Sequence, residues 1–254
     1  MSVSFQNVGK VVHRAGRAYE LLHDTNLCVE NDARVGILGG PKSGKTTLLR
    51  LICGTETPDT GIIKRDDNIS WPIPLANFLV NTSSVALNIR FVQRLYGIKH
   101  KDFPRQIAEL GGFLEFLNVE LQKCPPLVKA QLTFALGIGM DFDIYLFDDR
   151  VGPPQKQFKE RATELFKCRT EGRGVVVASS IPAEIEAHCD SVFVLDDGRV
   201  THFDDVKDGV SHFKNLMKAA NEKQKNAEEA KEDDEGAGGT EEAADGMEEL
   251  AAAL

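Results

Sequence analysis

The side chains best suited to chemistry are gathered in one glycine-rich run. It consists of Gly39, Gly40, Pro41, Lys42, Ser43, Gly44, Lys45, Thr46 and Thr47. The run fits the spacing G-x-x-x-x-G-K-[ST] at every fixed position. Glycines let the backbone curve so that successive N–H groups point at one anion. We therefore expect this loop to hold a phosphate chain, with Lys45 on the outer phosphates and Thr46 on Mg²⁺.

Two carboxylates follow a second apolar run, because Asp148 and Asp149 come directly after Ile144–Phe147. A magnesium ion at a phosphate loop needs a carboxylate at the end of a neighbouring strand. Asp148 is therefore expected to hold the metal through a bound water. An acidic turn after a core strand is the simpler alternative, and the loop upstream favours the metal role.

The elements around the loop have the order that phosphate binding requires. Residues 34–38 are typical of a short buried strand, and residues 45–53 of a helix that Gly54 closes. A glycine turn that binds nothing is the alternative. With all fixed positions filled and both flanks correct, the pattern favours phosphate binding.

The rest of the chain predicts an α/β protein. Strand and helix patterns alternate after Ile144, which is typical of a largely parallel sheet covered on both faces. Short strands are expected within residues 3–30 and at 62–64, and an inserted helical subdomain over about residues 84–140. The later elements are expected as helices at 155–170, 182–188 and from 205 to about 231, and strands at 174–178 and 191–195.

Composition and charge narrow the classes of protein. No apolar run in the 254 residues reaches the length of a membrane-spanning helix, and the first residues lack a secretion signal, so we expect a cytoplasmic location. From Ala220 to Leu254, twelve Asp or Glu stand against three Lys, a net charge of −9 that equals the formal charge of the chain. The acidity therefore belongs to a tail, residues 219–254, which we expect to be disordered. The body lacks the basic surface typical of nucleic-acid binding.

The order of phosphate loop, helical insertion, apolar strand ending in aspartate and strand–helix alternation resembles the ATP-binding subunit of an ABC transporter. Ile69–Pro72, Asn88–Val92 followed by Arg94–Gly97, and the Cys189-Asp190 step are similar to the branch that exports capsular polysaccharide and lipopolysaccharide O-chains. The resemblance covers about residues 3–218. It implies a P-loop NTPase fold, an ABC-type nucleotide-binding domain with an N-terminal β-subdomain, and ATP and Mg²⁺ as ligands.

The resemblance also implies partners and roles. That family works as two ATP-binding subunits under a membrane-spanning pair, with each ATP held between one subunit's phosphate loop and the other's signature loop. A permease subunit and a second ATP-binding subunit, identical or different, are therefore expected, with residues 1–218 as the ATP-binding domain on the inner face of the cell membrane. Asp149 stands where the family has a glutamate as catalytic base, one carbon–carbon bond, about 1.5 Å, shorter. The aromatic that stacks on adenine aligns with Val12, and Tyr19 is a second candidate.

Several positions depart from the family's pattern. The signature loop, rich in Ser and Gly in the family, falls on Cys124–Val128, which contains Pro125-Pro126. The glutamine that senses the metal and the membrane subunit aligns with Val80, and the switch histidine aligns with Ser180. The aspartate of the loop after the second carboxylate aligns with Gln155. We therefore expect ATP binding to be retained and hydrolysis to be weak.

Two functions remain open at this point. One is an ATP-binding subunit that couples ATP binding and weakened hydrolysis to polysaccharide export. The other is a catalytically degenerate scaffold or regulatory subunit of a membrane export assembly. An unrelated phosphate-loop kinase is disfavoured because no acceptor-binding or lid residues stand out.

Overall fold

The computed structural model describes residues 3–14, 16–74, 78–152 and 156–237. The chain divides into two compact units, Met1–Val210 and Ser211–Leu254. All the strands that the described residues form belong to the first unit.

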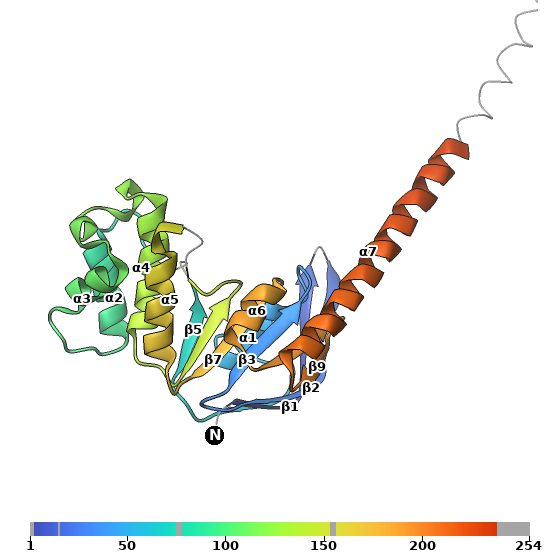
Figure 1. Cartoon of the computed structure of the whole chain (residues 1–254), viewed down its shortest axis with the longest axis horizontal. Coiled ribbons are helices and arrows are strands. Elements are labelled where there is room, and N and C mark those ends of the chain that lie inside the picture. The colour runs from blue at the N-terminus through green and yellow to red at the C-terminus, as the bar shows by residue number, and fades with distance from the viewer. Residues whose placement is uncertain (1–2, 15, 75–77, 153–155, 238–254) are drawn as a thin grey trace, which may run out of the picture. The chain divides into compact units, whose positions relative to one another are not determined.

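The larger sheet has six strands in the order β5-β6-β7-β3-β8-β9, and its neighbours are parallel except β8 and β9 (Figure 1). Its strands are β3 (Arg34–Gly39), β5 (Ile69–Ile73), β6 (Ile144–Asp148), β7 (Gly174–Ser179), β8 (Ser191–Asp196) and β9 (Arg199–Phe203). The inner strands are nearly continuous apolar runs, because helices bury both faces of a parallel sheet. The predicted parallel sheet is confirmed.

A second, antiparallel sheet has the order β2-β1-β4, with β4 at Thr60–Arg65. Strands β1 (Val3–Arg14) and β2 (Arg17–Val29) form one long hairpin, so the expectation of several short strands was wrong. Register shifts along β1 interrupt its apolar alternation, which explains the error. The hairpin shares one hydrophobic core with the first helix and the larger sheet.

Helices lie on both faces of the larger sheet. Helix α1 (Lys45–Cys53) packs on β3, β5, β6 and β7, whereas α6 (Pro182–His188) packs on β3 and β7 from the other face. The predicted helical insertion contains α2 (Val85–Leu95), α3 (Phe103–Gly111) and α4 (Pro126–Gly139). Two short 3₁₀ turns join α3 to α4, and α5 (Lys156–Thr170) packs on α4 (Figure 1).

Strand β5 is an element that the sequence did not predict as a strand. Its proline at position 72 lacks an N–H group and is atypical of a strand interior. The structure accommodates Pro72 because β5 is an edge strand that pairs with β6 alone. Trp71 next to it packs on Phe78, Tyr96 and Phe142, so this tryptophan anchors the sheet edge to helix α2.

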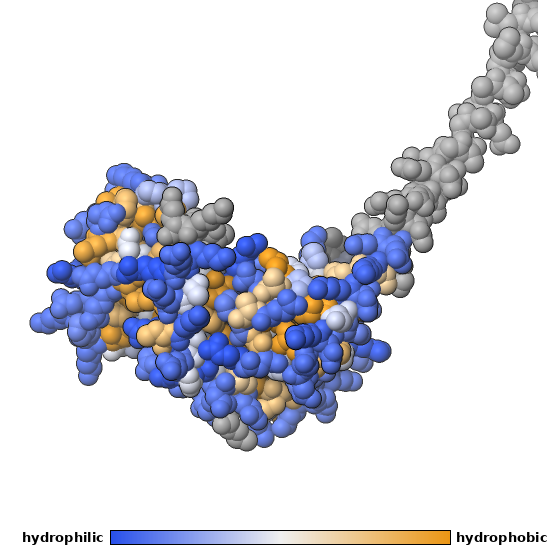
Figure 2. Space-filling model, viewed as in Figure 1, coloured by the Kyte–Doolittle hydropathy of each residue, from blue (hydrophilic) through white to orange (hydrophobic). Residues whose placement is uncertain are grey.

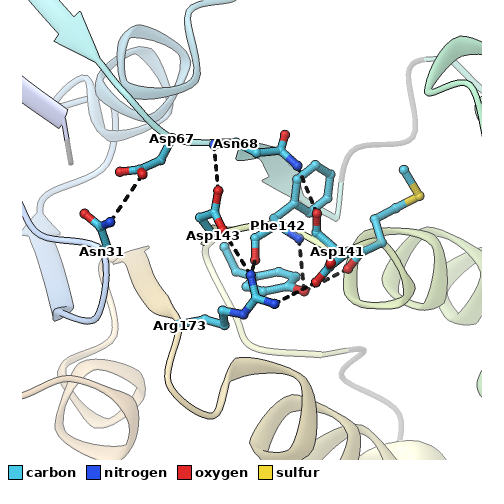
Figure 3. A network of polar contacts seen from close by, with 9 residues as sticks. Asn31, Asp67, Asn68, Asp141, Phe142, Asp143 and Arg173 are labelled. Carbon is cyan, nitrogen blue, oxygen red and sulfur yellow. Dashed lines mark hydrogen bonds and ion pairs between the residues drawn. The ribbon is translucent and has the colours of Figure 1, made fainter. Parts of the chain in front are cut away.

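A polar network fastens the N-terminal ends of the parallel strands (Figure 3). Arg173, before β7, forms ion pairs of 2.9 Å with Asp141 and 3.1 Å with Asp143, before β6. The Asp143 carboxylate also accepts a 3.0 Å hydrogen bond from the backbone N–H of Asn68, before β5. Ligands of such sheets bind at the carboxyl ends of the strands. This network lies at the opposite ends of the strands.

The last element of the described residues is helix α7 (Val206–Ala237), whose greater part belongs to the second unit. The expected helix from residue 205 is confirmed, and it extends beyond residue 231. Residues 238–254 of the predicted tail lie outside the described residues, and the domain boundary at residue 218 stays a prediction. None of the described helices combines the length and apolar character that a membrane crossing requires.

Candidate functional site

The phosphate loop lies between β3 and α1, as predicted. Gly44 caps α1 with a φ of 106°, a left-handed conformation that favours glycine. A Cβ atom on Gly39 would come within 2.4 Å of the Ser43 Oγ and 3.0 Å of the Leu195 carbonyl oxygen. Both positions therefore require glycine, and the loop closes tightly over the N-terminus of α1.

Lys45 and Ser43 supply the polar groups inside this loop. The Lys45 ammonium donates hydrogen bonds of 2.8 Å to the carbonyl oxygens of Gly39 and Gly40. Burial lowers the pKa of Lys45, whereas the carboxylates of Asp148 and Asp149 act in the opposite direction. The Ser43 Oγ is buried and has no hydrogen-bond partner among the described residues. An orphaned hydroxyl beside a lysine amine fits a phosphate oxygen, which accepts hydrogen bonds from both.

Thr46 and Asp148 converge from opposite sides of the site. The Thr46 hydroxyl donates a 2.8 Å hydrogen bond to the Asp148 carboxylate, which β6 delivers at its carboxyl end. Burial raises the pKa of Asp148, and the Thr46 hydrogen bond partly offsets this rise. A hydroxyl and a carboxylate are oxygen ligands of the kind that Mg²⁺ takes, together with waters and phosphates. The residues therefore fit the predicted metal, and no group of three His, Cys, Asp or Glu forms another metal cluster in the described part of the chain.

Arg50 is a residue of the site that the sequence analysis missed. It follows Thr46 by four positions, which places both side chains on one face of α1. Both line a cavity of about 350 Å³ together with Asp148 and the loop after α1. The positive charge of Arg50 tends to lower the pKa of Asp148. The four-residue spacing was the signal that would have found it.

Asp149 follows the metal ligand but has an unusual backbone. Its φ is 81°, in the left-handed region, and its side chain is exposed. Its N–H group donates a 2.7 Å hydrogen bond to the Ala178 carbonyl oxygen, and its own carbonyl oxygen accepts one of 2.7 Å from the Ser179 hydroxyl. Asp149 lines a different cavity, of about 410 Å³, on the side of Phe134 in helix α4. The end of β7 thus fixes the direction of this residue.

Two further aligned positions, Val80 and Ser180, do not carry the side chains that the family has there. Val80 is 52% exposed, and its backbone N–H and C=O groups are both hydrogen-bonded to the Asn88 side chain, at 2.7 and 3.1 Å. Ser180 follows Ser179, whose hydroxyl also accepts a 3.1 Å hydrogen bond from the N–H of Ile181. The loop carrying Val80 is therefore fastened to α2, and the loop carrying Ser180 to β7.

The aligned signature loop forms the start of α4. Pro125 is its N-cap and Pro126 its first residue, and both are exposed. Prolines have no N–H group, and the Val128 N–H group already donates a 3.0 Å hydrogen bond to the Pro125 carbonyl oxygen. This helix start has therefore lost much of the donor capacity that makes helix N-termini bind phosphate.

The two candidates for adenine stacking are direct neighbours. Val12 of β1 lies opposite Tyr19 of β2 in the antiparallel register, so their side chains are on the same face of the hairpin. Tyr19 is 46% exposed. Leu21, on the same strand, lies 3.4 Å from the position of a Cβ atom on Gly44. The hairpin therefore brings Tyr19 to the side of the phosphate loop, whereas Gln155 lies outside the described residues.

Comparison with known proteins finds relatives that are named as ATP-binding proteins. Residues 22–112 match the family model described as ABC transporter. The chain is 30% identical over 220 residues to the ATP-binding protein BexA of Haemophilus influenzae, covering 85% of this chain and all of that protein. It is 32% identical over 200 residues to the capsule polysaccharide export ATP-binding protein CtrD of Neisseria meningitidis, covering 77% and 91%. The polysialic acid transport ATP-binding protein KpsT of Escherichia coli is 27% identical, with 84% and 96% covered.

Solved structures agree on the fold. An ATP-binding cassette solved as a dimer in a post-hydrolysis state with ADP and Pi has a TM-score of 0.67 and 19% identity, covering 79% of this chain and 97% of that one. The ATP-binding subunit of an ABC transporter has a TM-score of 0.67 and 16% identity, covering 80% and 90%. The predicted P-loop fold class is therefore confirmed.

Proposed function

The chain belongs to the family of ABC transporter ATP-binding proteins, and from this premise we propose that it is the ATP-binding subunit of an exporter of capsular or lipopolysaccharide-type polysaccharide. Relatives with capsule and polysialic acid export in their names support this substrate class. In this role, ATP binding and a weakened hydrolysis are coupled to transport by a membrane-spanning partner. The protein then works at the inner face of the cell membrane.

The phosphate loop is the observation that carries the proposal. Lys45 and the N-terminus of α1 bind the β and γ phosphates, and Thr46 and Asp148 hold Mg²⁺. When bound, the ion neutralises phosphate charge. The contact between Thr46 and Asp148 supports this role, because both oxygens already face one point. The remaining loop residues, Gly39 to Ser43 and Thr47, shape the phosphate cradle.

Weak hydrolysis follows from the groups around that cradle. A general base must come within about 2.6 to 3.2 Å of the proton it takes, directly or through one water. Asp149 is shorter than glutamate, and its backbone is held in the left-handed region by Ala178 and Ser179. The prolines at the start of α4 reduce the number of N–H groups there. This chain therefore has fewer hydrogen-bond donors for the nucleotide of a second ATP-binding subunit, whether that subunit is identical or different.

Helix α2 supports docking on a permease. Leu87, Phe91 and Leu95 follow one another at four-residue spacing and are 54%, 53% and 68% exposed. We call these three residues the α2 patch. Exposed Arg90 and Arg94 flank it, and Figure 2 shows apolar residues reaching the surface over the helical insertion. A contiguous apolar stripe on an otherwise polar helix face is typical of a protein interface.

A second function is favoured by the same departures. A nucleotide-binding scaffold or regulatory subunit would need the phosphate loop and the α2 patch, but neither a base nor a signature loop. The positions of Asp149 and Pro125 fit this alternative as well as they fit slow hydrolysis.

One experiment tests the proposal and separates the two functions. ATP binding by calorimetry and ATP turnover are measured on the same purified sample, with and without the membrane partner, for wild type and Lys45→Ala. We expect Mg-ATP binding with little turnover in wild type, and no binding in the variant. Loss of export by Lys45→Ala with normal assembly supports the transport role, whereas unchanged export supports the scaffold. Absence of ATP binding in wild type, or turnover at ordinary transporter rates, contradicts the proposal.

A further inference from the structure

Helix α2 has a single exposed face, which carries positive charge as well as the α2 patch. With about 100° of rotation per residue, the five exposed residues of the helix fall into one arc around its axis. Their order around the axis is Arg90, Arg94, Leu87, Phe91 and Leu95. The two arginines therefore lie together on one flank of the α2 patch and do not alternate with its apolar residues.

The loop between α2 and α3 adds two lysines to this flank. The Gln93 side-chain amide donates hydrogen bonds of 3.2 Å and 2.6 Å to the carbonyl oxygens of Ile98 and His100. These bonds fold the loop back onto the last turn of the helix. Gln93 is next to the arginines in the order around the axis, so the loop lies on their side of the helix. Lys99 and Lys101 of this loop are both exposed.

These four cations have no counter-charge in the described part of the chain. We call them the basic strip: Arg90, Arg94, Lys99 and Lys101. No side chain of the strip forms an ion pair or hydrogen bond with another described residue. The sequence from Leu87 to Lys101 contains no Asp or Glu, and Asp102, which follows, pairs with none of the four. The next cation, Arg105 of α3, differs from them because Glu109 neutralises it at 2.8 Å.

Single exposed Lys and Arg side chains are usually only solvated. The basic strip differs because four unpaired cations gather beside three large exposed apolar residues, which is the composition of helices that lie on anionic bilayers. The cytoplasmic leaflet of a cell membrane carries a negative surface potential that attracts such clusters. Cytoplasmic loops of membrane-spanning proteins carry an excess of Lys and Arg. A permease loop is therefore a poorer counterpart for the strip than the lipid around the permease.

We propose that the basic strip binds the anionic phosphate headgroups of the cytoplasmic leaflet. This inference rests on the proposed location at the inner face of the cell membrane and adds a contact with lipid to the docking of the α2 patch. The permease covers the patch, and the strip on its flank contacts the headgroups beside the permease. The contact is electrostatic and needs no nucleotide.

The experiment measures co-flotation of the full chain with vesicles of phosphatidylcholine, with or without phosphatidylglycerol, in the absence of nucleotide and permease. Wild type is compared with the double variant Arg90→Gln/Arg94→Gln. The control is Lys64→Gln/Arg199→Gln, which removes the same charge from exposed positions on β4 and β9. Because the formal net charge of the chain is −9, general attraction does not explain binding to anionic vesicles.

We expect wild type to bind the anionic vesicles and not the neutral ones. The arginine variant is expected to lower the vesicle partition coefficient by about fivefold for each charge removed, roughly 25-fold for the pair. The control should bind as wild type does, and about 0.5 M salt should release the protein by screening. Unchanged melting temperatures show that the variants are folded.

Three results overturn the lipid contact. They are absence of wild-type binding to anionic vesicles, an equal loss in both double variants, and a loss in the arginine variant that appears only with permease in neutral vesicles. The last result would mean that the strip pairs with the permease. Calorimetric titration with ATP on the same samples keeps the proposed function separate. A wild type that binds ATP but no vesicles loses the lipid contact alone, whereas one that binds vesicles but no ATP contradicts the proposed function and leaves the strip standing.

Discussion

The Thr46 hydroxyl lies 2.8 Å from the Asp148 carboxylate, although the two residues are 102 positions apart in the sequence. Helix α1 fixes one of them and strand β6 the other, so the arrangement depends on the packing of α1 against the sheet. The next residue, Asp149, no longer has the extended backbone of β6, because its φ lies in the left-handed region. The expected metal ligand and the expected catalytic base are therefore adjacent in the sequence but differ in backbone conformation.

Introducing the family's glutamate at position 149 is not expected to raise the rate of ATP hydrolysis. Asp149→Glu adds one methylene group, but the peptide remains held by the Ala178 carbonyl oxygen and the Ser179 hydroxyl. We expect ATP turnover of Asp149→Glu to stay at the wild-type level in a steady-state phosphate-release assay. Asp149→Asn is the matched control, and it should change the residual turnover little. A rise of about tenfold or more in Asp149→Glu would show that side-chain length alone limits the rate.

The phosphate loop and its flanks could be predicted because their determinants are local. Gly39 and Gly44 lie where only glycine fits, and the strand before and the helix after them have clear apolar patterns. Strand β5 could not be predicted, because Pro72 is tolerated only at an edge, and the position of a strand in a sheet is a property of the whole fold. The alignment gave Val12, with Tyr19 as a second candidate, for stacking on the adenine base. It did not show that the two residues lie opposite each other in the hairpin.

The orientation of Asp149 could not be predicted from the sequence for the same reason. Its φ depends on the end of β7, which lies about thirty positions further along the chain. Arg50 was missed although its spacing from Thr46 is visible in the sequence, because nothing in the motif assigns a role to the second turn of the helix. Metal binding by Asp148, in contrast, was inferred from the apolar run that ends in it and from the phosphate loop upstream, and it stays a prediction that the geometry supports.

Tyr19 is expected to contribute to nucleotide affinity by stacking on the adenine base and not by contacting the phosphates. Stacking of a base on an aromatic ring is worth about 1–3 kcal/mol, as judged by substitution to alanine. We expect Tyr19→Ala to weaken ATP binding by about tenfold and to leave binding of inorganic tripolyphosphate unchanged. Tyr19→Phe should retain affinity, and adding Val12→Tyr to Tyr19→Ala should restore it, because the two positions face each other. Equal loss for ATP and tripolyphosphate would indicate a damaged loop instead of a lost stack.

Cys189 is expected to make stability fall at alkaline pH. Burial raises the pKa of its thiol to about 12, compared with about 8.5 for an exposed thiol. Between these values the unfolded chain releases a proton that the folded chain keeps, so the free energy of unfolding decreases as pH rises. Urea unfolding at pH 7.5, 9 and 10 should show a steeper decline for wild type than for Cys189→Ala. Cys168→Ala, at an exposed position, is the control, and parallel curves for all three proteins would contradict the assignment.

Arg173 is expected to stabilise the fold without affecting the nucleotide site. Its guanidinium bridges Asp141 and Asp143 and donates a 3.0 Å hydrogen bond to the Phe142 carbonyl oxygen, at the N-terminal ends of β6 and β7 (Figure 3). We expect Arg173→Ala to lower the free energy of unfolding by about 1–2 kcal/mol, because the pairs are partly exposed. Asp141→Asn is the control; with the Asp141 side chain 84% exposed, it should cost less than about 0.5 kcal/mol. ATP affinity should be unchanged in both, because the site lies at the opposite ends of the strands. A fall in ATP affinity without a loss of stability would mean that the two ends are coupled through the sheet.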